Sequence, residues 1–219
     1  MEYLILDFGN VLAYPTTGNW HITPKFLELI DMNKINKEQL KENIKKYQYL
    51  IDCSLDIKTL QEEFTTMKSF YENVLKGIYN EYSDKLIEEI AYNRVYEFDK
   101  YELYEDVYDE LNRLSKKYKI ILLSDNWPSL LEYMKYKKIE CFFEKIYISS
   151  MYSLKKENGE FFDLVLKEFN VKDNSIFVDD HEENLTIAEE KGIHGLLMDR
   201  KCSYFDSKFK IINSLKDII

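Results

Sequence analysis

Positive charge is in short supply in this sequence. Of 219 residues, 30 are Lys or Arg and 40 are Asp or Glu, so the formal net charge is −10. Such an excess of negative charge repels a phosphodiester backbone, which argues against nucleic acid as a partner. Long apolar runs are also missing, since none approaches the roughly 18 residues that a membrane-spanning helix needs. We therefore expect neither a nucleic-acid-binding protein nor a membrane protein.

Cysteine, proline and glycine are scarce too. The three cysteines, Cys53, Cys141 and Cys202, have neither the even number of a disulfide framework nor the close spacing of a metal site. The first residues, MEYLILD, lack the basic region of a signal peptide. Both features predict a cytoplasmic location. With only 3 Pro and 6 Gly beside 18 Tyr and 13 Phe, we expect a helix-rich globule.

Five short apolar segments have the composition of strands that are buried on both faces of a sheet. They are Tyr3–Leu6, Lys119–Leu123, Lys145–Ile148, Ser175–Val178 and Gly195–Met198. Helical patterns lie between the later segments; in one of them Phe161, Val165 and Phe169 recur on one face. Strands that alternate with helices indicate an α/β fold, here a parallel five-stranded sheet flanked by helices.

The stretch from residue 14 to residue 96 breaks this alternation. It predicts consecutive helices with no strand between them, at Lys25–Asp31, Lys37–Tyr49, Ile57–Ile78 and Asp84–Tyr96. An all-helical insertion between the first and second strands explains the pattern. The sequence thus predicts a core built from residues 1–13 and 97–219, with residues 14–96 forming a helical cap.

Polar residues stand where three of the predicted strands end. In open parallel sheets, ligands bind outside the carboxyl ends of the strands. A single Asp, Ser or Asn at such a place is usually only a helix cap or a turn former. A pair of lysines usually lies on the solvent-exposed surface. Their joint occurrence at one edge indicates a site that contains Asp7, Ser124-Asp125-Asn126, Asp179-Asp180 and, ahead of the helix near Gly159, Lys155-Lys156.

In order and context, these segments resemble the motifs of the haloacid dehalogenase-like (HAD) hydrolase superfamily. The resemblance is closest to the phosphatase branch with a helical cap after the first strand. The four motifs are LILDFGNV, IILLSDNW, SLKKENGEFF and IFVDDHEENL, and they extend from Asp7 to Asn184. The resemblance implies a Rossmann-like core and Mg²⁺-dependent hydrolysis of a small phosphorylated metabolite, with sugar phosphates among the candidates.

The resemblance also implies the roles of the acidic residues. Asp7 matches the nucleophile, whose carboxylate attacks phosphorus and forms an acyl phosphate. Mg²⁺ prefers oxygen ligands and neutralises charge on the transferred group. The Asp7 carboxylate, the Gly9 carbonyl and Asp180 match its ligands, with Asp179 beside them. Asn184 is expected to orient the Asp179–Asp180 pair.

Donors to the phosphate oxygens follow from the same resemblance. Ser124, the backbone amides of Asp125 and Asn126, and a lysine match the family's phosphate-binding groups. The lysine is either Lys155 or Lys156. Its distance from the start of the Phe161-Phe162 helix favours Lys156.

One position departs from the family pattern. Most phosphatases of the superfamily carry a second Asp two residues after the nucleophile, as a general acid and base, and here that residue is Gly9. Acid–base help of this kind contributes about 10²–10⁴-fold to a rate. Sugar-1-phosphate phosphatases with Asp-x-Gly-Asn in this motif resemble the present pattern. In that case the proton could come from substrate, from water or from the cap, where His21 is a candidate.

Two alternatives remain from the same departure. Metal-independent dehalogenases also lack the second Asp, but a site without metal gains only repulsion from the adjacent Asp179 and Asp180. A pseudo-phosphatase that binds a phosphorylated ligand or a partner would have little reason to keep Asp7 together with Ser124 and Lys156. The sequence leaves the substrate open, and either a monomer or a dimer is expected.

Overall fold

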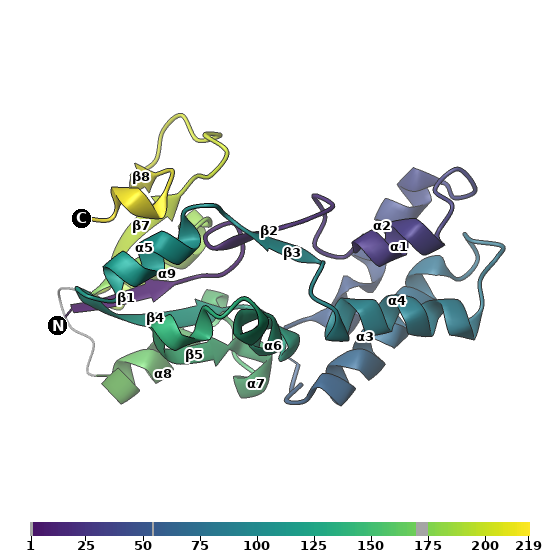
Figure 1. The fold of residues 1–219 in the computed structure, drawn as a ribbon, viewed down its shortest axis with the longest axis horizontal. Helices are drawn as coiled ribbons and strands as arrows, with labels where there is room; N and C mark the ends of the chain where they lie inside the picture. Colours follow the sequence, from purple (N-terminus) through teal and green to yellow (C-terminus); the bar gives the residue numbers. More distant parts are fainter. Residues whose placement is uncertain (1, 54, 170–174) are drawn as a thin grey trace.

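The computed structural model describes residues 2–53, 55–169 and 175–219. The chain forms two lobes, seen at the left and right of Figure 1. The left lobe contains the main sheet and both chain ends, and the right lobe contains α1–α4. Within the described residues, no helix has the length and apolar character needed to cross a bilayer.

The main sheet is parallel throughout and has six strands in the order β5-β4-β1-β6-β7-β8. The predicted α/β fold with a parallel sheet is confirmed, but the predicted number of five strands is wrong. The missed strand, β8, covers only three residues at the edge of the sheet, too few to give a clear apolar pattern. The strands are β1 (Glu2–Leu6), β4 (Tyr118–Ser124), β5 (Phe143–Ile148), β6 (Ile176–Asp179), β7 (His194–Met198) and β8 (Lys210–Ile212).

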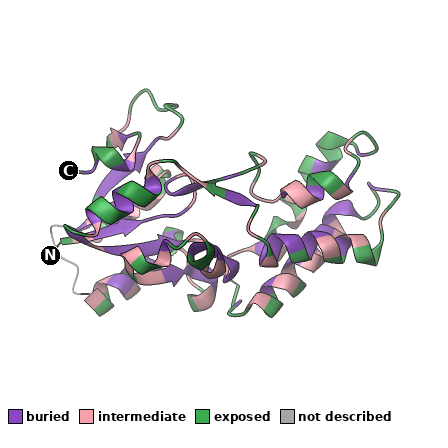
Figure 2. Ribbon diagram, in the orientation of Figure 1, coloured by how far each residue is buried: buried purple, intermediate pink, exposed green. Residues whose placement is uncertain are grey.

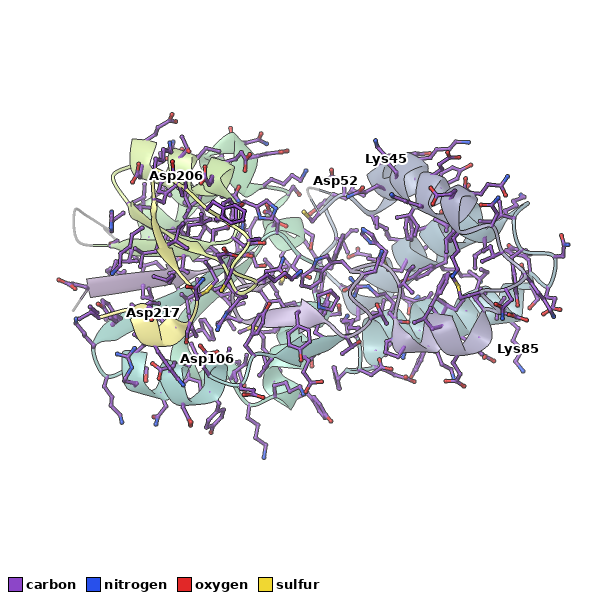
Figure 3. All side chains as sticks on the ribbon, turned by 90° about the horizontal axis from the view of Figure 1, so that it is seen from above. Lys45, Asp52, Lys85, Asp106, Asp206 and Asp217 are labelled. Atoms are coloured by element: carbon purple, nitrogen blue, oxygen red, sulfur yellow. The ribbon has the colours of Figure 1, made fainter. Side chains whose placement is uncertain are left out.

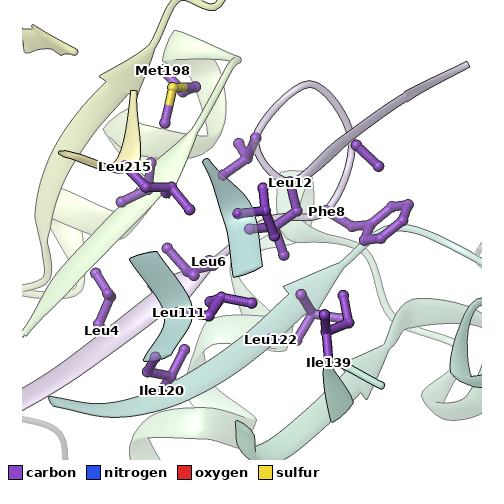
Figure 4. Packing of buried hydrophobic residues seen from close by; sticks show 14 of the residues in the cluster. Leu4, Leu6, Phe8, Leu12, Leu111, Ile120, Leu122, Ile139, Met198 and Leu215 are labelled. Atoms are coloured by element: carbon purple, nitrogen blue, oxygen red, sulfur yellow. The ribbon is translucent and has the colours of Figure 1, made fainter. Parts of the chain in front are cut away.

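Helices cover both faces of this sheet. Along β1, Leu4 and Leu6 pack on one face with α5 and α6, while Ile5 packs on the other with α8 and α9. Figure 4 shows Leu4, Leu6 and the β4 side chains gathered around Leu111 of α5. β1 is therefore buried on both faces, which explains its continuous apolar run. These helices are α5 (Val107–Leu114), α6 (Ser129–Tyr136), α8 (Glu160–Phe169) and α9 (Glu182–Glu190).

The right lobe has a core of its own. Its helices are α1 (Pro24–Leu29), α2 (Lys37–Tyr47), α3 (Leu60–Leu75) and α4 (Asp84–Tyr96). Side-chain oxygens of Thr23, Asn36, Thr59 and Ser83 cap their N-termini, as such residues commonly do. Their buried residues, purple on the ribbon in Figure 2, form a hydrophobic cluster that is separate from the clusters of the sheet.

A two-stranded antiparallel ribbon joins the lobes (Figure 1). β2 (Ala13–Pro15) pairs with β3 (Tyr101–Leu103). The expectation that the stretch from residue 14 contains only helices is therefore wrong at its start, because three residues give too little pattern to be recognised as a strand. The boundaries of the cap at residues 14 and 96 stay a prediction. Among the described residues, the shorter helices are α7 (Ser149–Tyr152) and the 3₁₀ turns Gln48–Ile51, Glu140–Phe142, Lys156–Asn158 and Leu215–Asp217.

The order of the strands determines where a ligand can enter. From β1 the chain moves outward to β4 and β5, and then returns to the other side of β1 for β6, β7 and β8. Leu6 lies beside Leu122 of β4 and Val178 of β6. The loops after these strands therefore meet around Asp7, at the crevice where open parallel sheets bind ligands.

The right lobe closes over this edge of the sheet. Asp52, labelled in Figure 3, lies where the two lobes meet, and Lys155 Nζ is 3.1 Å from its Oδ2. Ser149 Oγ donates a hydrogen bond to the carbonyl of Cys53 at 3.0 Å. Contacts other than the ribbon thus hold the helices against the crevice.

Candidate active site

A pocket of about 450 Å³ lies between the two lobes. Its core wall comes from the loops after β1, β4 and β6, and its other wall from the right lobe and the ribbon. The lining residues are Asp7, Gly9, Asn10, Trp20, His21, Gln48, Arg94, Tyr101, Ser124, Asp125, Asn126, Trp127, Lys155, Lys156, Glu157, Asp180, His181 and Asn184. Of the sequence-predicted site residues, Asp179 alone is outside this lining.

Lys156 holds two carboxylates together at the bottom of the pocket. Its Nζ lies 2.9 Å from Asp7 Oδ1 and 2.5 Å from Asp179 Oδ2. All three side chains are buried. Asp179 also accepts hydrogen bonds from the backbone amide of His181, at 2.8 Å, and from Asn184 Nδ2, at 3.1 Å. A continuous set of contacts thus links Asn184 to Asp179, Asp179 to Lys156, and Lys156 to Asp7.

The two candidate lysines are separated by the structure. Lys156 is 3% exposed and faces Asp7, whereas Lys155 points to Asp52 and Glu157 at the junction of the lobes. Attraction by the Asp179 and Asp7 carboxylates outweighs burial and raises the pKa of Lys156. The buried ammonium is therefore charged at neutral pH, and the geometry favours Lys156 as the predicted phosphate-binding lysine.

Asp180 belongs to a second cluster at the mouth of the site. Asn10 Nδ2 donates a hydrogen bond to Asp180 Oδ2 at 2.8 Å, and His181 Nδ1 lies 2.8 Å from Oδ1. Asn10 has a positive φ of 51°, a conformation that Asn adopts more readily than most residues. This turn places the amide of Asn10 against the loop after β6. Sequence reasoning missed Asn10, although a polar residue directly after Gly9 was a visible signal.

Burial and neighbouring charges shift the pKa of several groups in the site. Burial raises the pKa of Asp7 to about 7, with the attraction of Lys156 opposing the shift and the charges of Asp179 and Asp180 adding to it. Burial also acts on Asp179, but there Lys156 and the hydrogen bonds of His181 hold the pKa below its ordinary value. Hydrogen bonds to Asp179 and Asp180 raise the pKa of His181 to about 10.

These groups fit a divalent cation. The charges of Asp179 and Asp180 both act on Asp7, and ligand atoms of Asp179, Asp180 and His181 lie within 4.8 Å of one another. Oxygen donors of this kind are those that Mg²⁺ prefers. A cation near Asp7 would also favour its ionised form, which burial disfavours. The Asp179 side chain is fully buried, whereas the Asp180 side chain is 16% exposed, so Asp180 is the more accessible of the adjacent pair.

The loop after β4 carries the other predicted phosphate-binding groups. Ser124, the last residue of β4, is buried and lines the pocket, and Asp125 Oδ1 accepts a hydrogen bond from the amide of Lys156 at 3.3 Å. The amide of Asn126 donates to Ser149 Oγ at 3.0 Å. A ligand oxygen would have to compete with Ser149 for that donor, and the Asn126 side chain bonds to the amide of Trp127.

Trp20 covers the position where a second Asp would stand. A Cβ added to Gly9 would lie 3.4 Å from the ring atoms Cη2 and Cζ2 of Trp20 and 3.8 Å from Asp7 Oδ2. That separation is ordinary contact, so a methyl group fits, but a longer side chain would meet the indole. An apolar ring thus lies beside Asp7, at the position where the sequence resemblance leads us to expect a second carboxylate.

His21 lines the pocket but is not charged. Burial, together with the nearby charge of Arg94, lowers the pKa of His21 to about 4. Its ring centroid lies 5.7 Å from that of Phe70. A neutral imidazole is a weak proton donor at neutral pH. The role of His21 as a cap acid stays a prediction, and this pKa weighs against it.

Arg94 and Trp127 are lining residues that the sequence did not assign to the site. Arg94 lies in α4 and is only 2% exposed. Trp127 follows the predicted phosphate-binding loop and packs against the apolar core of the right lobe. From the sequence pattern of its helix, Arg94 would be taken for an ordinary surface arginine. Only the folded structure shows that it lines the pocket.

Comparison with known proteins agrees with this geometry. The haloacid dehalogenase-like hydrolase family matches residues 1–192, so the chain belongs to that family of hydrolases. No curated protein matches the sequence.

Solved structures share the fold at low sequence identity. The HAD-hydrolase YfnB from Bacillus subtilis, bound to magnesium, has a TM-score of 0.68 and 13% identity over 99% of this chain and 96% of that chain. A 2-haloacid dehalogenase from Pseudomonas syringae has a TM-score of 0.66 and 13% identity over 100% and 96%. The HAD family enzyme bt-2542 from Bacteroides thetaiotaomicron, in complex with magnesium and inorganic phosphate, has a TM-score of 0.56 and 22% identity over 94% and 98%.

Proposed function

We propose that this hydrolase is a magnesium-dependent phosphatase that acts on a small phosphorylated metabolite. The observation that carries the proposal is Lys156, which is buried within 2.9 Å of Asp7 and so presents a fixed positive charge beside the nucleophile. A phosphate dianion approaching a carboxylate requires such charge. A sugar phosphate is the substrate class that the Asp-x-Gly-Asn sequence at Asp7 favours.

In the proposed reaction, an oxygen of the Asp7 carboxylate attacks phosphorus, and the bond from phosphorus to the leaving oxygen breaks. The leaving oxygen takes a proton from solvent water and departs as an alcohol. A water molecule then attacks the acyl phosphate, gives up a proton to solvent and releases inorganic phosphate, which restores Asp7. Ser124, the amides of Asp125 and Asn126, and Lys156 are the proposed donors to the phosphate oxygens.

Asp7, the carbonyl of Gly9 and Asp180, with Asp179 behind them, are the residues that would hold Mg²⁺. When bound, the ion supplies positive charge against the transferred phosphoryl group. Asn10 keeps Asp180 in place through its 2.8 Å hydrogen bond. Asn184 does the same for Asp179, as partners behind metal ligands commonly do.

One observation favours a second function. Gly9 and the apolar ring of Trp20 beside Asp7 suit a dehalogenase, whose halide leaving group needs no proton. The pairing of Asp179 and Asp180 near Asp7 argues for the phosphatase, because a site without metal gains only repulsion from these charges.

The test is release of phosphate from a panel of sugar phosphates, nucleotides and an aryl phosphate, with chloropropionate as the dehalogenase probe. Each substrate is assayed with Mg²⁺, with a chelator, and with the Asp7→Asn variant. We expect turnover of a phosphate ester that needs both Mg²⁺ and Asp7. Halide release that persists with chelator would replace this proposal by the dehalogenase, and a folded protein without turnover would replace it by a binding module.

We also propose a cytoplasmic enzyme, monomeric or dimeric, with no nucleic-acid partner. All three cysteines are free thiols, which fits a reducing compartment. The net charge of −10 fits a small metabolite, drawn in by the local positive charge of Lys156, better than it fits a polyanion.

A further inference from the structure

The wall that the right lobe contributes to the pocket contains a buried arginine. Arg94 is 2% exposed and lines the same pocket as Asp7 and Lys156. Its guanidinium carbon lies 5.6 Å from the ring centroid of Tyr101 and 5.5 Å from that of Trp127. The two rings hold the guanidinium by cation–π contact and limit its freedom to turn away.

Two hydrogen-bond donors on this wall have no acceptor. Within the described residues, Arg94 Nη1 and Trp127 Nε1 are both buried and without a hydrogen-bond partner. Leaving such donors unsatisfied destabilises a fold. Two unsatisfied donors in one pocket indicate a ligand that brings its own acceptor oxygens.

The nearest carboxylate does not satisfy Arg94. Glu63 Oε1 lies 4.0 Å from Arg94 Nη1, which is too long for a hydrogen bond. Both oxygens of Glu63 accept from Ser129 instead, at 2.7 Å from its amide and 2.6 Å from its hydroxyl. Glu63 therefore stabilises the buried charge from a distance and leaves the donor free for a ligand.

We propose that Arg94 and Trp127 form a second oxyanion subsite. The preferred substrate is then a small phosphate ester that carries another anionic group, a carboxylate or a second phosphate. A planar guanidinium is suited to both of these groups. The inference rests on the proposed phosphatase function for its first anion, which Lys156 and Ser124 would bind, and it adds the second anion at the cap.

Two pairs of substrates test the subsite and distinguish its two possible anions. Phosphoglycerate and glycerol phosphate differ by a carboxylate, and glucose bisphosphate and glucose phosphate differ by a phosphate. We expect kcat/KM with Mg²⁺ to favour the doubly anionic member of at least one pair by about 10-fold or more, mainly through KM. Equal values within both pairs would overturn the proposal.

The variants assign the preference to Arg94. Arg94→Gln should bring the ratio within the preferred pair close to one, while Arg94→Lys should keep part of it, because the charge remains without the planar fork. Arg113→Gln is the matched control, since Arg113 pairs with Glu110 on α5 and lies outside the pocket lining. A preference that survives in Arg94→Gln would overturn the proposal. Should this variant not fold, Trp127→Phe removes the other donor and should reduce the same ratio.

Binding separates the subsite from the reaction. In the Asp7→Asn background, calorimetry with the same four compounds measures affinity without turnover. A preference for the second anion that disappears in Asp7→Asn/Arg94→Gln supports the subsite even if no phosphatase activity is found. Equal affinities in the Asp7→Asn protein overturn it even if that activity is found.

Discussion

Two buried clusters, one in each lobe, pair a basic side chain with carboxylates in different ways. In the core, Lys156 Nζ is within 2.9 Å of both Asp7 and Asp179. In the cap, Arg94 Nη1 stays 4.0 Å from Glu63 and has no hydrogen-bond partner among the described residues. The core cluster is internally satisfied, and the cap cluster is not.

This difference separates chemistry from recognition. A cation fixed between two carboxylates is preorganised for a transferred phosphoryl group, which every substrate of such an enzyme shares. A hydrogen-bond donor without an acceptor can discriminate between substrates. A substrate that supplies the acceptor gains a hydrogen bond, whereas one that lacks it leaves the buried donor unsatisfied. On the proposed function, the core cluster would take part in the reaction and the cap cluster would select the substrate.

The largest effect is expected at the core cation. Lys156→Met should reduce turnover by roughly 10²–10³-fold, as loss of one charge-stabilising donor does. It should also lower the free energy of unfolding by about 3–5 kcal/mol, because buried carboxylates lose their partner. Phosphate release and urea unfolding measure the two effects. Lys155→Met, at the junction with Asp52, is the control and should cost at most about 1 kcal/mol. Similar behaviour of both variants would remove the distinction between the lysines.

The next effect concerns the missing carboxylate. Gly9→Asp alone should not raise turnover, since the indole of Trp20 lies against that position. Gly9→Asp/Trp20→Ala should exceed Trp20→Ala alone by about 10²-fold, the lower end of general acid–base help. Initial rates on an unactivated phosphate ester are the measurement. A rate increase from Gly9→Asp by itself would show that Trp20 does not block the position.

A smaller effect is expected on the pH dependence of stability, through His21 in the cap. The pKa of His21 is about 4 in the fold and 6.5 as its ordinary value, so between these values the unfolded chain binds a proton that the folded chain does not. The free energy of unfolding should therefore fall as pH falls from 6.5 to 4, by at most about 3 kcal/mol. His21→Gln should make this decline shallower in urea unfolding at stepped pH. His194→Gln, at an exposed position, should leave it unchanged, and parallel curves for wild type and His21→Gln would contradict the assignment.

The smallest effect is expected at the carboxylate of the cap cluster. Glu63→Gln should lower the free energy of unfolding by about 1–3 kcal/mol, because Ser129 loses a charged acceptor and Arg94 a nearby counter-charge. Glu88→Gln, an exposed partner of Lys68, should change it by less than about 1 kcal/mol. Thermal or urea unfolding compares the two. Equal losses of unfolding free energy in the two variants would mean that the buried contacts of Glu63 contribute no more to stability than an exposed ion pair does.

The sequence predicted the core far better than the cap wall. Strands buried on both faces have continuous apolar runs, and the polar residues at their ends, Asp7, Ser124 and Asp179, can be recognised directly in the sequence. Parallel pairing then brings these ends together without further information. The lysine assignment was only favoured by spacing, and it took the buried position of Lys156 to separate it from Lys155.

The remaining features depend on long-range packing. Arg94 faces the pocket only because α4 lies against the crevice, and nothing in the helical pattern around it indicates an unsatisfied donor. Trp20 reaches Gly9 through the course of the ribbon. β8 and β2 contain three residues each, too few for a period-2 pattern to be recognised. Such contacts follow from the assembled lobes and could not be derived from local sequence.

The most direct test of the central claim is to trap the phosphoryl group on Asp7. Wild-type protein with Mg²⁺ and its preferred phosphate ester is quenched with acid during turnover, and its peptides are analysed by mass spectrometry. The account predicts one added phosphoryl group on the peptide that contains Asp7, and none in the presence of chelator or in Asp7→Asn. Phosphate release from wild type with the added group on another residue would contradict it.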